Sequence, residues 1–217
     1  MSERSGSADS LWAIEWRSED ELPTAEVLTA IEPTGAEIAD ASADLAAYYN
    51  DAHNRQMMAH EEEPFTAAAV ASYYRELREE GGRPFLLQRA EAGALTLLGD
   101  GDLRNIEDGT AEVAIMIGGR AVQGRGLGTR YATMLHVFAF AVLGLERLYI
   151  SVIPANAASR RLFEKLVYEI DDSPDARDLI DDESDVTMSV SRARFESTAA
   201  ASLSRIRTYR RGTALLL

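Results

Sequence analysis

The stretch of sequence that decides the fold runs from Glu112 to Tyr131 and reads Glu112-VAIMIGGRAV-Gln123-GRGLGTRY. Its first part is nearly all apolar, which predicts a strand buried on both faces. A glycine-rich loop follows, and then a long apolar helix that reaches Leu143 and stops at Gly144. This order favours an anion site, because glycine lets backbone N–H groups approach a phosphate where the helix dipole attracts it.

The charge distribution around this stretch supports the same interpretation. The chain has 217 residues and a formal net charge of −14, yet positions 113–145 contain no Asp or Glu. The only charged side chains in this window, His excepted, are Arg120, Arg125 and Arg130. The simpler alternative is that a buried strand and helix contain few charges.

The glycine spacing argues against two common phosphate-binding loops. A Walker loop needs Lys-Ser or Lys-Thr after its last glycine, whereas Gly124 is followed by Arg125 and Gly126. The dinucleotide fingerprint needs G-x-G-x-x-G, and this chain has G-x-G-x-G. A nucleotide-phosphate binder is therefore disfavoured.

The hexapeptide from Gln123 to Gly128 does fit the pattern Q/R-x-x-G-x-G/A. This is the acyl-CoA pyrophosphate loop of the GCN5-related N-acetyltransferase (GNAT) superfamily, which the chain resembles over about residues 95–192. The segment from Pro154 to Tyr168 is similar to N-x-x-S-x-x-x-x-E-K-L-G-F, found in the branch that acetylates ribosomal-protein N-termini. The chain departs from that segment at Val167, where the family usually has glycine.

The order of elements predicts an α+β fold, a mixed α/β sandwich, as the resemblance also implies. A central mixed sheet of about seven strands is expected, with helices on both faces. The expected strands lie at 25–31, 85–89, 95–98, 111–117, 147–153 and 186–191, with a short docking strand within 11–16, and the other expected helices at 34–49, 66–79 and 157–166.

The chain is expected to divide into three parts. Residues 1–22 form a polar leader, residues 23–192 the acetyltransferase domain, and residues 193–217 a basic extension with five arginines and one glutamate. The extension packs on its own domain or on a second subunit of a homodimer, and the sequence does not choose between them.

The resemblance implies roles for two catalytic residues. Glu112 lies eleven residues before Gln123, the spacing of the base glutamate in the histone-acetyltransferase branch; the alternative is a solvated residue at the start of a strand. Phe163 stands where many members have a Tyr that protonates the departing thiolate. Ser159 is the nearest substitute, as in the ribosomal-protein branch.

The resemblance also implies acetyl-CoA as cosubstrate, without a metal. Loop N–H groups would hold its pyrophosphate, the splayed end of the strand would pair with its pantetheine arm, and an N–H near Met116 would polarise the thioester carbonyl. Asn156 is expected either to bind the cosubstrate or to cap a helix. The residues expected to contact acetyl-CoA are Ile115, Met116, Ile117, Gln123, Gly124, Arg125, Gly126, Leu127, Gly128, Thr129, Asn156, Ser159 and Phe163.

The function predicted from these features is an acyl-CoA-dependent N-acyltransferase that moves acetyl directly to a primary amine, on a small molecule or a protein N-terminus. The chain has no cysteine, which excludes a thiolate carrier and Cys-ligated metals. The alternative is a non-catalytic acyl-CoA-binding sensor or interaction module, which Phe163 and Val167 favour.

Charge and hydropathy limit the expected partners and location. The acidic body would attract cationic acceptors such as polyamines, aminoglycosides or basic N-terminal segments, and it argues against nucleic acid or anionic lipid. The longest nearly apolar run, positions 134–145, is too short to span a membrane, and no hydrophobic signal segment is seen, so a soluble cytoplasmic protein is expected. His53 and His60 are expected in a solvated loop, and Tyr73 and Tyr74 in helix packing.

Overall fold

A nine-stranded mixed sheet forms the centre of the computed structural model, which describes residues 11–17, 26–58, 63–91, 93–178 and 184–212. Its strands follow the order β7-β8-β6-β5-β4-β3-β2-β1-β9, and neighbours are antiparallel except for the parallel pair β5–β6. The strands are β1 (Trp12–Arg17), β2 (Val27–Ile31), β3 (Arg83–Glu91), β4 (Ala94–Glu107), β5 (Thr110–Ile117), β6 (Arg147–Val152), β7 (Glu169–Ile170), β8 (Val186–Ser191) and β9 (Ile206–Arg210).

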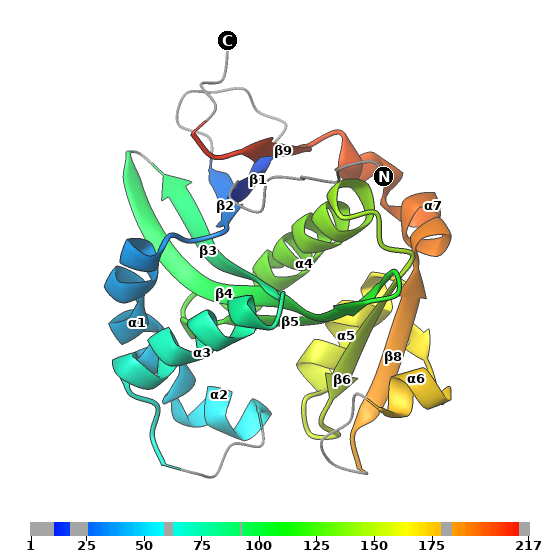
Figure 1. Ribbon diagram of the computed structural model, residues 1–217, viewed down its shortest axis with the longest axis horizontal. Helices are drawn as coiled ribbons and strands as arrows, with labels where there is room; N and C mark the ends of the chain where they lie inside the picture. The colour runs from blue at the N-terminus through cyan, green and yellow to red at the C-terminus, as the bar shows by residue number, and fades with distance from the viewer. Residues whose placement is uncertain (1–10, 18–25, 59–62, 92, 179–183, 213–217) are drawn as a thin grey trace, which may run out of the picture.

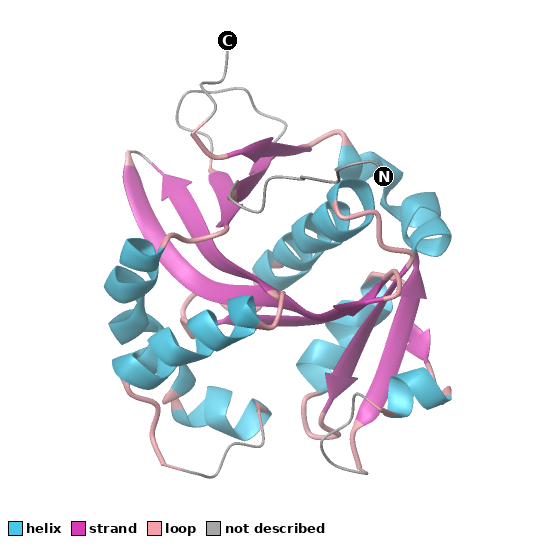
Figure 2. Ribbon diagram, in the orientation of Figure 1, coloured by secondary structure: helices cyan, strands magenta, loops and turns pink. Residues whose placement is uncertain are grey.

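Helices cover both faces of the sheet (Figures 1 and 2). The helices are α1 (Gly35–Tyr49), α2 (Ala52–Met57), α3 (Ala67–Glu79), α4 (Leu127–Val137), the π-helical turn η1 (Phe138–Val142), α5 (Ala157–Lys165), α6 (Pro174–Arg177) and α7 (Arg192–Leu203). The larger apolar core lies between the sheet and α4, η1, α5 and α7, and a smaller core lies under α1 and α3. In the part of the chain that the structure describes, no helix is long and apolar enough to cross a membrane.

The predicted mixed α/β fold is confirmed, although the sheet has nine strands where about seven were expected. One additional strand is the two-residue β7, too short to leave a pattern in the sequence. The other is β9, which pairs with β1 at the edge of the sheet. The segments expected as leader and extension thus each contribute a strand, and the predicted boundaries at 22 and 192 remain predictions.

Several local predictions differ from the structure. The long helix expected to reach Leu143 ends as an α-helix at Val137 and continues as the π-helical turn η1. His53 lies on α2 and not in a loop, because Asp51 caps that short helix; His60 is outside the described residues. The strand expected at 95–98 runs on to Glu107.

A buried histidine organises the aromatic core behind the sheet. His136 is fully buried among the rings of Phe140, Phe163, Tyr168 and Phe195. Its Nδ1 lies 2.6 Å from the Ala132 carbonyl oxygen and its Nε2 2.7 Å from the Tyr168 hydroxyl. Burial lowers the pKa of His136 to about 4, so the ring is neutral near pH 7. This network assigns the proton to Nδ1, and Nε2 accepts from Tyr168.

We predict that Tyr168→Phe lowers the free energy of unfolding by about 1–2 kcal/mol, because the buried Nε2 of His136 loses its only described donor while the aromatic packing stays. Urea denaturation at pH 7.5 measures this. Tyr209→Phe is the matched control: it removes a hydroxyl bonded to Glu15 at a half-exposed position, and a smaller loss is expected. Equal losses in the two variants would contradict the role given to His136.

Candidate active site

The two parallel strands of the sheet form a fork. β5 pairs with β6 at three positions only, from Thr110 opposite Arg147 to Glu112 opposite Tyr149. Beyond Glu112, β5 stays paired with β4 as far as Ile117, while β6 stays paired with β8 as far as Val152. Figure 1 shows β5 and β6 meeting at one end and separating toward the other. The β6-facing edge of β5 is therefore left without a described strand beyond Glu112.

The glycine loop lies directly after β5 and leads into α4. Gly124 and Gly126 have φ angles of +74° and +76°, values that side-chain-bearing residues rarely adopt, and both residues are exposed. Gly126 is the N-cap of α4 and provides no side-chain acceptor. Each other α-helix among the described residues has a side-chain cap, from Thr34, Asp51, Thr66, Asn156, Ser173 or Ser191. The first N–H groups of α4 are thus left for an anion.

The side chain of Gln123 forms hydrogen bonds that connect the loop to the end of β5. Its Nε2 donates to the Ile117 carbonyl oxygen at 2.7 Å and to Asn54 Oδ1 at 3.1 Å. The buried Asn54 amide in turn donates to the carbonyl oxygens of Tyr48 and Gly118, at 2.9 and 3.1 Å. Gln123 therefore shapes the site through these contacts, and Asn54, which sequence reasoning missed, completes the network from α2.

The same short helix reaches the other arm of the fork. Asn156 caps α5 by accepting from the Ser159 N–H at 3.0 Å, and its Nδ2 donates to the Met57 carbonyl oxygen at 3.0 Å. The interpretation of Asn156 as a helix cap is thus confirmed, and its contact with acetyl-CoA remains a prediction. Through Asn54 and Met57, α2 bridges the β5 and α5 sides of the fork.

Glu112 lies at the apex of the fork as the last residue of β5 that pairs with β6. It is only 8% exposed, so the interpretation as a solvated strand-start residue is wrong. Its Oε2 lies 3.2 Å from Arg104 Nε and accepts from Asn105 Nδ2 at 3.2 Å. These contacts with two residues of β4 hold the carboxylate at the point where β5 and β6 separate.

The other predicted residues divide between the fork and the core. The part of β5 beyond Glu112, which does not pair with β6, contains the half-buried residues Ile115, Met116 and Ile117. The hydrogen bond from Gln123 to the Ile117 carbonyl oxygen holds the loop close to them. Phe163 and Leu127 have side chains buried in the main core, at 3% exposure each. Arg125 is exposed, Thr129 and Gly128 are half-buried in the first turn of α4, and Ser159 is half-buried in the first turn of α5. Roles in catalysis or binding remain predictions for all of them.

Two further features bear on the predicted site. Arg130, near the start of α4, pairs with Glu26 at 2.9 Å, so this cation already has a partner within the protein. Val167 has a φ of +60°, a left-handed conformation that is strained for a β-branched residue. That conformation explains in physical terms why glycine suits this position.

The comparison with protein families matches residues 38–169, more than half of the chain, to the acetyltransferase (GNAT) domain. The chain belongs to the GNAT acetyltransferase family. A comparison with curated protein sequences gives no match.

Solved structures show the same fold. RimJ from Mycobacterium smegmatis, in complex with CoA-disulfide, has a TM-score of 0.62 at 17% identity, covering 92% of this chain and 96% of that one. An aminoglycoside acetyltransferase with coenzyme A and kanamycin has a TM-score of 0.58 at 20% identity, covering 74% and 94%. A spermidine N-acetyltransferase chimera from Vibrio cholerae and hSSAT has a TM-score of 0.58 at 19% identity, covering 77% of this chain and 97% of that one.

This acetyltransferase also contains an acidic cluster that sequence reasoning missed. Asp100 and Asp102, on β4, are 4% and 5% exposed. Asp100 Oδ2 accepts from the hydroxyls of Tyr49 and Tyr74, the latter at 2.9 Å, and Asp102 Oδ2 accepts from Tyr73 at 2.9 Å. Tyr73 and Tyr74, expected to serve helix packing, thus also bind carboxylates. The Gly-Asp-Gly-Asp sequence gave no signal because it is typical of a turn.

Burial shifts the titration of this cluster. It raises the pKa of Asp100 to about 7, against the opposing effect of the tyrosine hydrogen bonds. It also raises the pKa of Asp102, and with the neighbouring aspartates it raises those of Tyr49, Tyr73 and Tyr74. Among the described residues, no group of three or more His, Asp or Glu side chains is placed to hold a metal ion.

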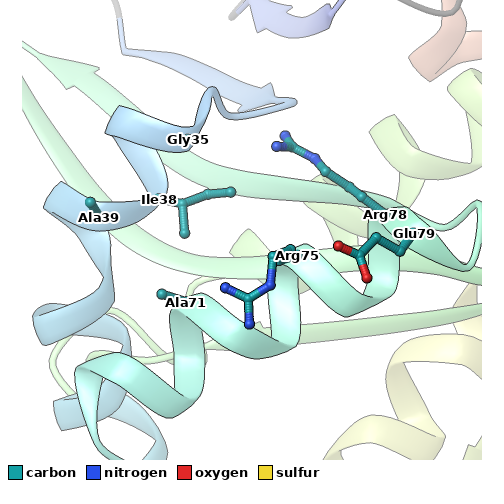
Figure 3. A pocket seen from close by; sticks show the side chains of 7 residues that line it. All are labelled: Gly35, Ile38, Ala39, Ala71, Arg75, Arg78 and Glu79. Atoms are coloured by element: carbon teal, nitrogen blue, oxygen red, sulfur yellow. The ribbon is translucent and has the colours of Figure 1, made fainter.

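A separate hollow of about 390 Å³ lies between α1 and α3. Figure 3 shows Gly35 and Ala39 from α1 facing Ala71 and Arg75 from α3. These α1 residues belong to the first turns of the helix, whereas Tyr48, which contacts Gly118 beside the loop, belongs to the last turn. The hollow is therefore at the opposite end of α1 from the fork.

We predict that Asp100→Asn raises the free energy of unfolding by about 1–3 kcal/mol at pH 8 and leaves it nearly unchanged at pH 4. The pKa of Asp100 rises on folding from 3.8 to about 7, so the wild-type fold loses stability as pH rises through this range and the carboxylate becomes charged. The amide cannot ionise. Urea denaturation at both pH values measures the difference between wild type and variant.

The exposed Asp40→Asn is the matched control, and it should show no such pH-dependent difference. A loss of stability in Asp100→Asn at pH 8 would mean that the charged carboxylate stabilises the fold, contrary to this account.

Proposed function

We propose that this protein transfers acetyl from acetyl-CoA directly to a primary amine. The observation that carries the proposal is the fork between β5 and β6, which opens at Glu112 beside the uncapped N-terminus of α4. A free strand edge suits an extended amide-containing chain, and uncommitted helix N–H groups suit a pyrophosphate. Family membership and the acetyltransferases of similar fold support the same chemistry.

The residues of the fork fit coenzyme A. Backbone N–H groups from Gly124 to Thr129 would hold the pyrophosphate, and the β5 edge from Ile115 to Ile117 would pair with the pantetheine arm. An N–H next to Met116, on Ile115 or Ile117, would polarise the thioester carbonyl, because the backbone of Met116 itself faces β4. Gln123 and Asn54 would hold the loop in a fixed position against the end of β5 through the hydrogen bonds described above.

The chemistry requires two proton transfers. The amine nitrogen forms a bond to the thioester carbonyl carbon, the carbon–sulfur bond breaks, and sulfur leaves with the electron pair. Glu112 takes, through intervening water, the proton that the amine loses, because Met116 lies four residues further along β5, and Arg104 balances its charge before the proton arrives. Ser159, in the first turn of α5, donates a proton to the thiolate and takes one back from water, because Phe163 is buried in the core and has no proton to give; Glu112 returns its proton to water.

The acceptor is a primary amine of a small molecule or of a protein N-terminus. The similar structures include enzymes named for aminoglycosides and for spermidine, and the net charge of −14 favours cationic acceptors. A cytoplasmic location and a homodimer remain predictions. The basic extension does pack on its own domain, since β9 pairs with β1 and Arg211 pairs with Glu37.

Thiol release tests the proposal against the non-catalytic alternative. The protein is incubated with acetyl-CoA and a panel of mono-amines, polyamines, aminoglycosides and N-terminal peptides, while free thiol is followed and calorimetry measures CoA binding. Thiol release that depends on an amine, with an acetylated amine found by mass spectrometry, supports the enzyme. CoA binding without thiol release from any amine supports the sensor or interaction module.

We predict that Glu112→Gln lowers kcat about 100-fold or more with the most active amine, because the amide cannot accept the proton. The Kd for CoA should change less than about twofold, since the side chain does not belong to the loop. Glu107→Gln, at the exposed end of β4, is the control and should keep wild-type turnover. Unchanged turnover in Glu112→Gln would refute its assignment as the base.

We predict that Gly126→Asp weakens CoA binding more than about tenfold, because it places a carboxylate at the N-terminus of α4 and strains a residue at φ +76°. Gly81→Asp is the control: Gly81 has a φ of +87° and equally open surroundings, but it lies at the end of α3. Calorimetric titration with CoA measures both. Equal weakening in the two variants would show that backbone strain alone, and not the loop, reduces affinity.

A further inference from the structure

Two carboxylate oxygens in the acidic cluster lack the donors that buried oxygens normally have. Within the described residues, Asp100 Oδ1 and Asp102 Oδ1 are buried and accept no hydrogen bond. The nearest cation to Asp102 Oδ1 is Arg104 Nε, at 3.7 Å. A buried acceptor without a donor costs stability and calls for an explanation, of which a missing ligand or water is the usual one.

The cluster faces the fork. Across the β4–β5 pair, Asp100 is opposite Met116, Asp102 is opposite Ala114, and Arg104 is opposite Glu112. Residues directly opposite each other in an antiparallel pair project to the same face, so the two aspartates share one face with the proposed base. Ala114 and Met116, which lie across the strand pair from the aspartates, are half-buried on the part of β5 that does not pair with β6.

The charges on this face do not balance. Asp100, Asp102 and Glu112 provide three carboxylates, and Arg104 forms ion pairs with two of them, Asp102 and Glu112. The Oδ2 atoms are already held by tyrosine hydroxyls, which fix the orientation of both aspartates. The Oδ1 atoms of the same carboxylates are therefore held in fixed positions as hydrogen-bond acceptors. The excess of carboxylates around them favours a further positive charge.

We propose that Asp100 and Asp102 bind an alkylammonium group of the acceptor while a second amine of the same molecule is acetylated beside Met116. This rests on the proposed function and adds the substrate class: an amine that carries a further ammonium group. Asp100 is directly opposite Met116 and Asp102 lies diagonally from it, so an ammonium group between them is about 5–8 Å from the second nitrogen. An alkyl chain of four or five carbons spans this distance.

The geometry favours an ammonium group over other cations. The described residues offer no cluster suited to a metal ion. The two aspartates are almost fully buried, so the entering group must be slender, and a primary ammonium has three N–H donors for two carboxylates. Tyr73, which is 36% exposed, forms the outer side of the cluster, where the alkyl chain would lie against its ring.

The test is calorimetric binding to the CoA-loaded protein, with 1,4-diaminobutane and butylamine as probes. The diamine should bind at least tenfold more tightly than the monoamine, because only the diamine reaches both places. Asp100→Asn and Asp102→Asn should each remove this preference, while Asp40→Asn should keep it. Thermal unfolding shows that the variants are folded, and each amide is expected to preserve or raise Tm.

Equal affinity for the two probes in wild type, together with no gain from a lysine at the second position of a peptide, would overturn the proposal and leave water as the partner of the aspartates. So would a preference that survives in both Asp→Asn variants. A peptide pair distinguishes the source of the ammonium: if a lysine at the second position strengthens binding of a peptide and the free diamine gives no preference, the group belongs to a protein side chain.

Failure of the proposed function has a different signature. If diamines bind with the expected preference but no amine releases thiol, the cation site stands and the transferase fails. If monoamines release thiol as efficiently as diamines, the transferase stands and the cation site fails.

Discussion

The end of strand pairing at Glu112 is the constraint on which the rest of the structure depends. Three paired positions hold β5 and β6 together, and beyond them each strand keeps its other neighbour. The separation leaves the β6-facing edge of β5 without a strand partner beyond Glu112, so backbone groups along it depend on side chains, water or a ligand for hydrogen bonds. The glycine loop, the N-terminus of α4 and the bridge through α2 all lie around this opening.

The acidic face of β4 and β5 shows a second constraint, the cost of burying charge. Asp100 and Asp102 are kept under α1 and α3, where burial raises the pKa of both. Apolar residues at these positions would make a more stable sheet. Three tyrosines hold the carboxylates in place, so the arrangement is specific and suits recognition of a cation.

The strand–loop–helix unit could be predicted from the sequence because its signals are local. An apolar run, the spacing from Gln123 to Gly128 and the cap at Thr34 each depend on neighbouring residues. The acidic cluster depends on contacts between residues far apart, such as Tyr49 with Asp100. Glycine and aspartate are poor strand formers, so β4 was predicted too short and its carboxylates were missed. Asn54 was missed because its partners Gly118 and Gln123 also lie far along the chain.

Amide hydrogen exchange with and without CoA tests whether the fork binds CoA, because it reports where the ligand covers backbone N–H groups. If the fork binds CoA, exchange becomes slower on CoA binding in peptides that cover positions 113–117 and 124–129. Little change is expected in peptides that cover the first turns of α1 and the middle of α3, which line the separate hollow. Protection confined to α1 and α3, with none at the fork, would contradict the account.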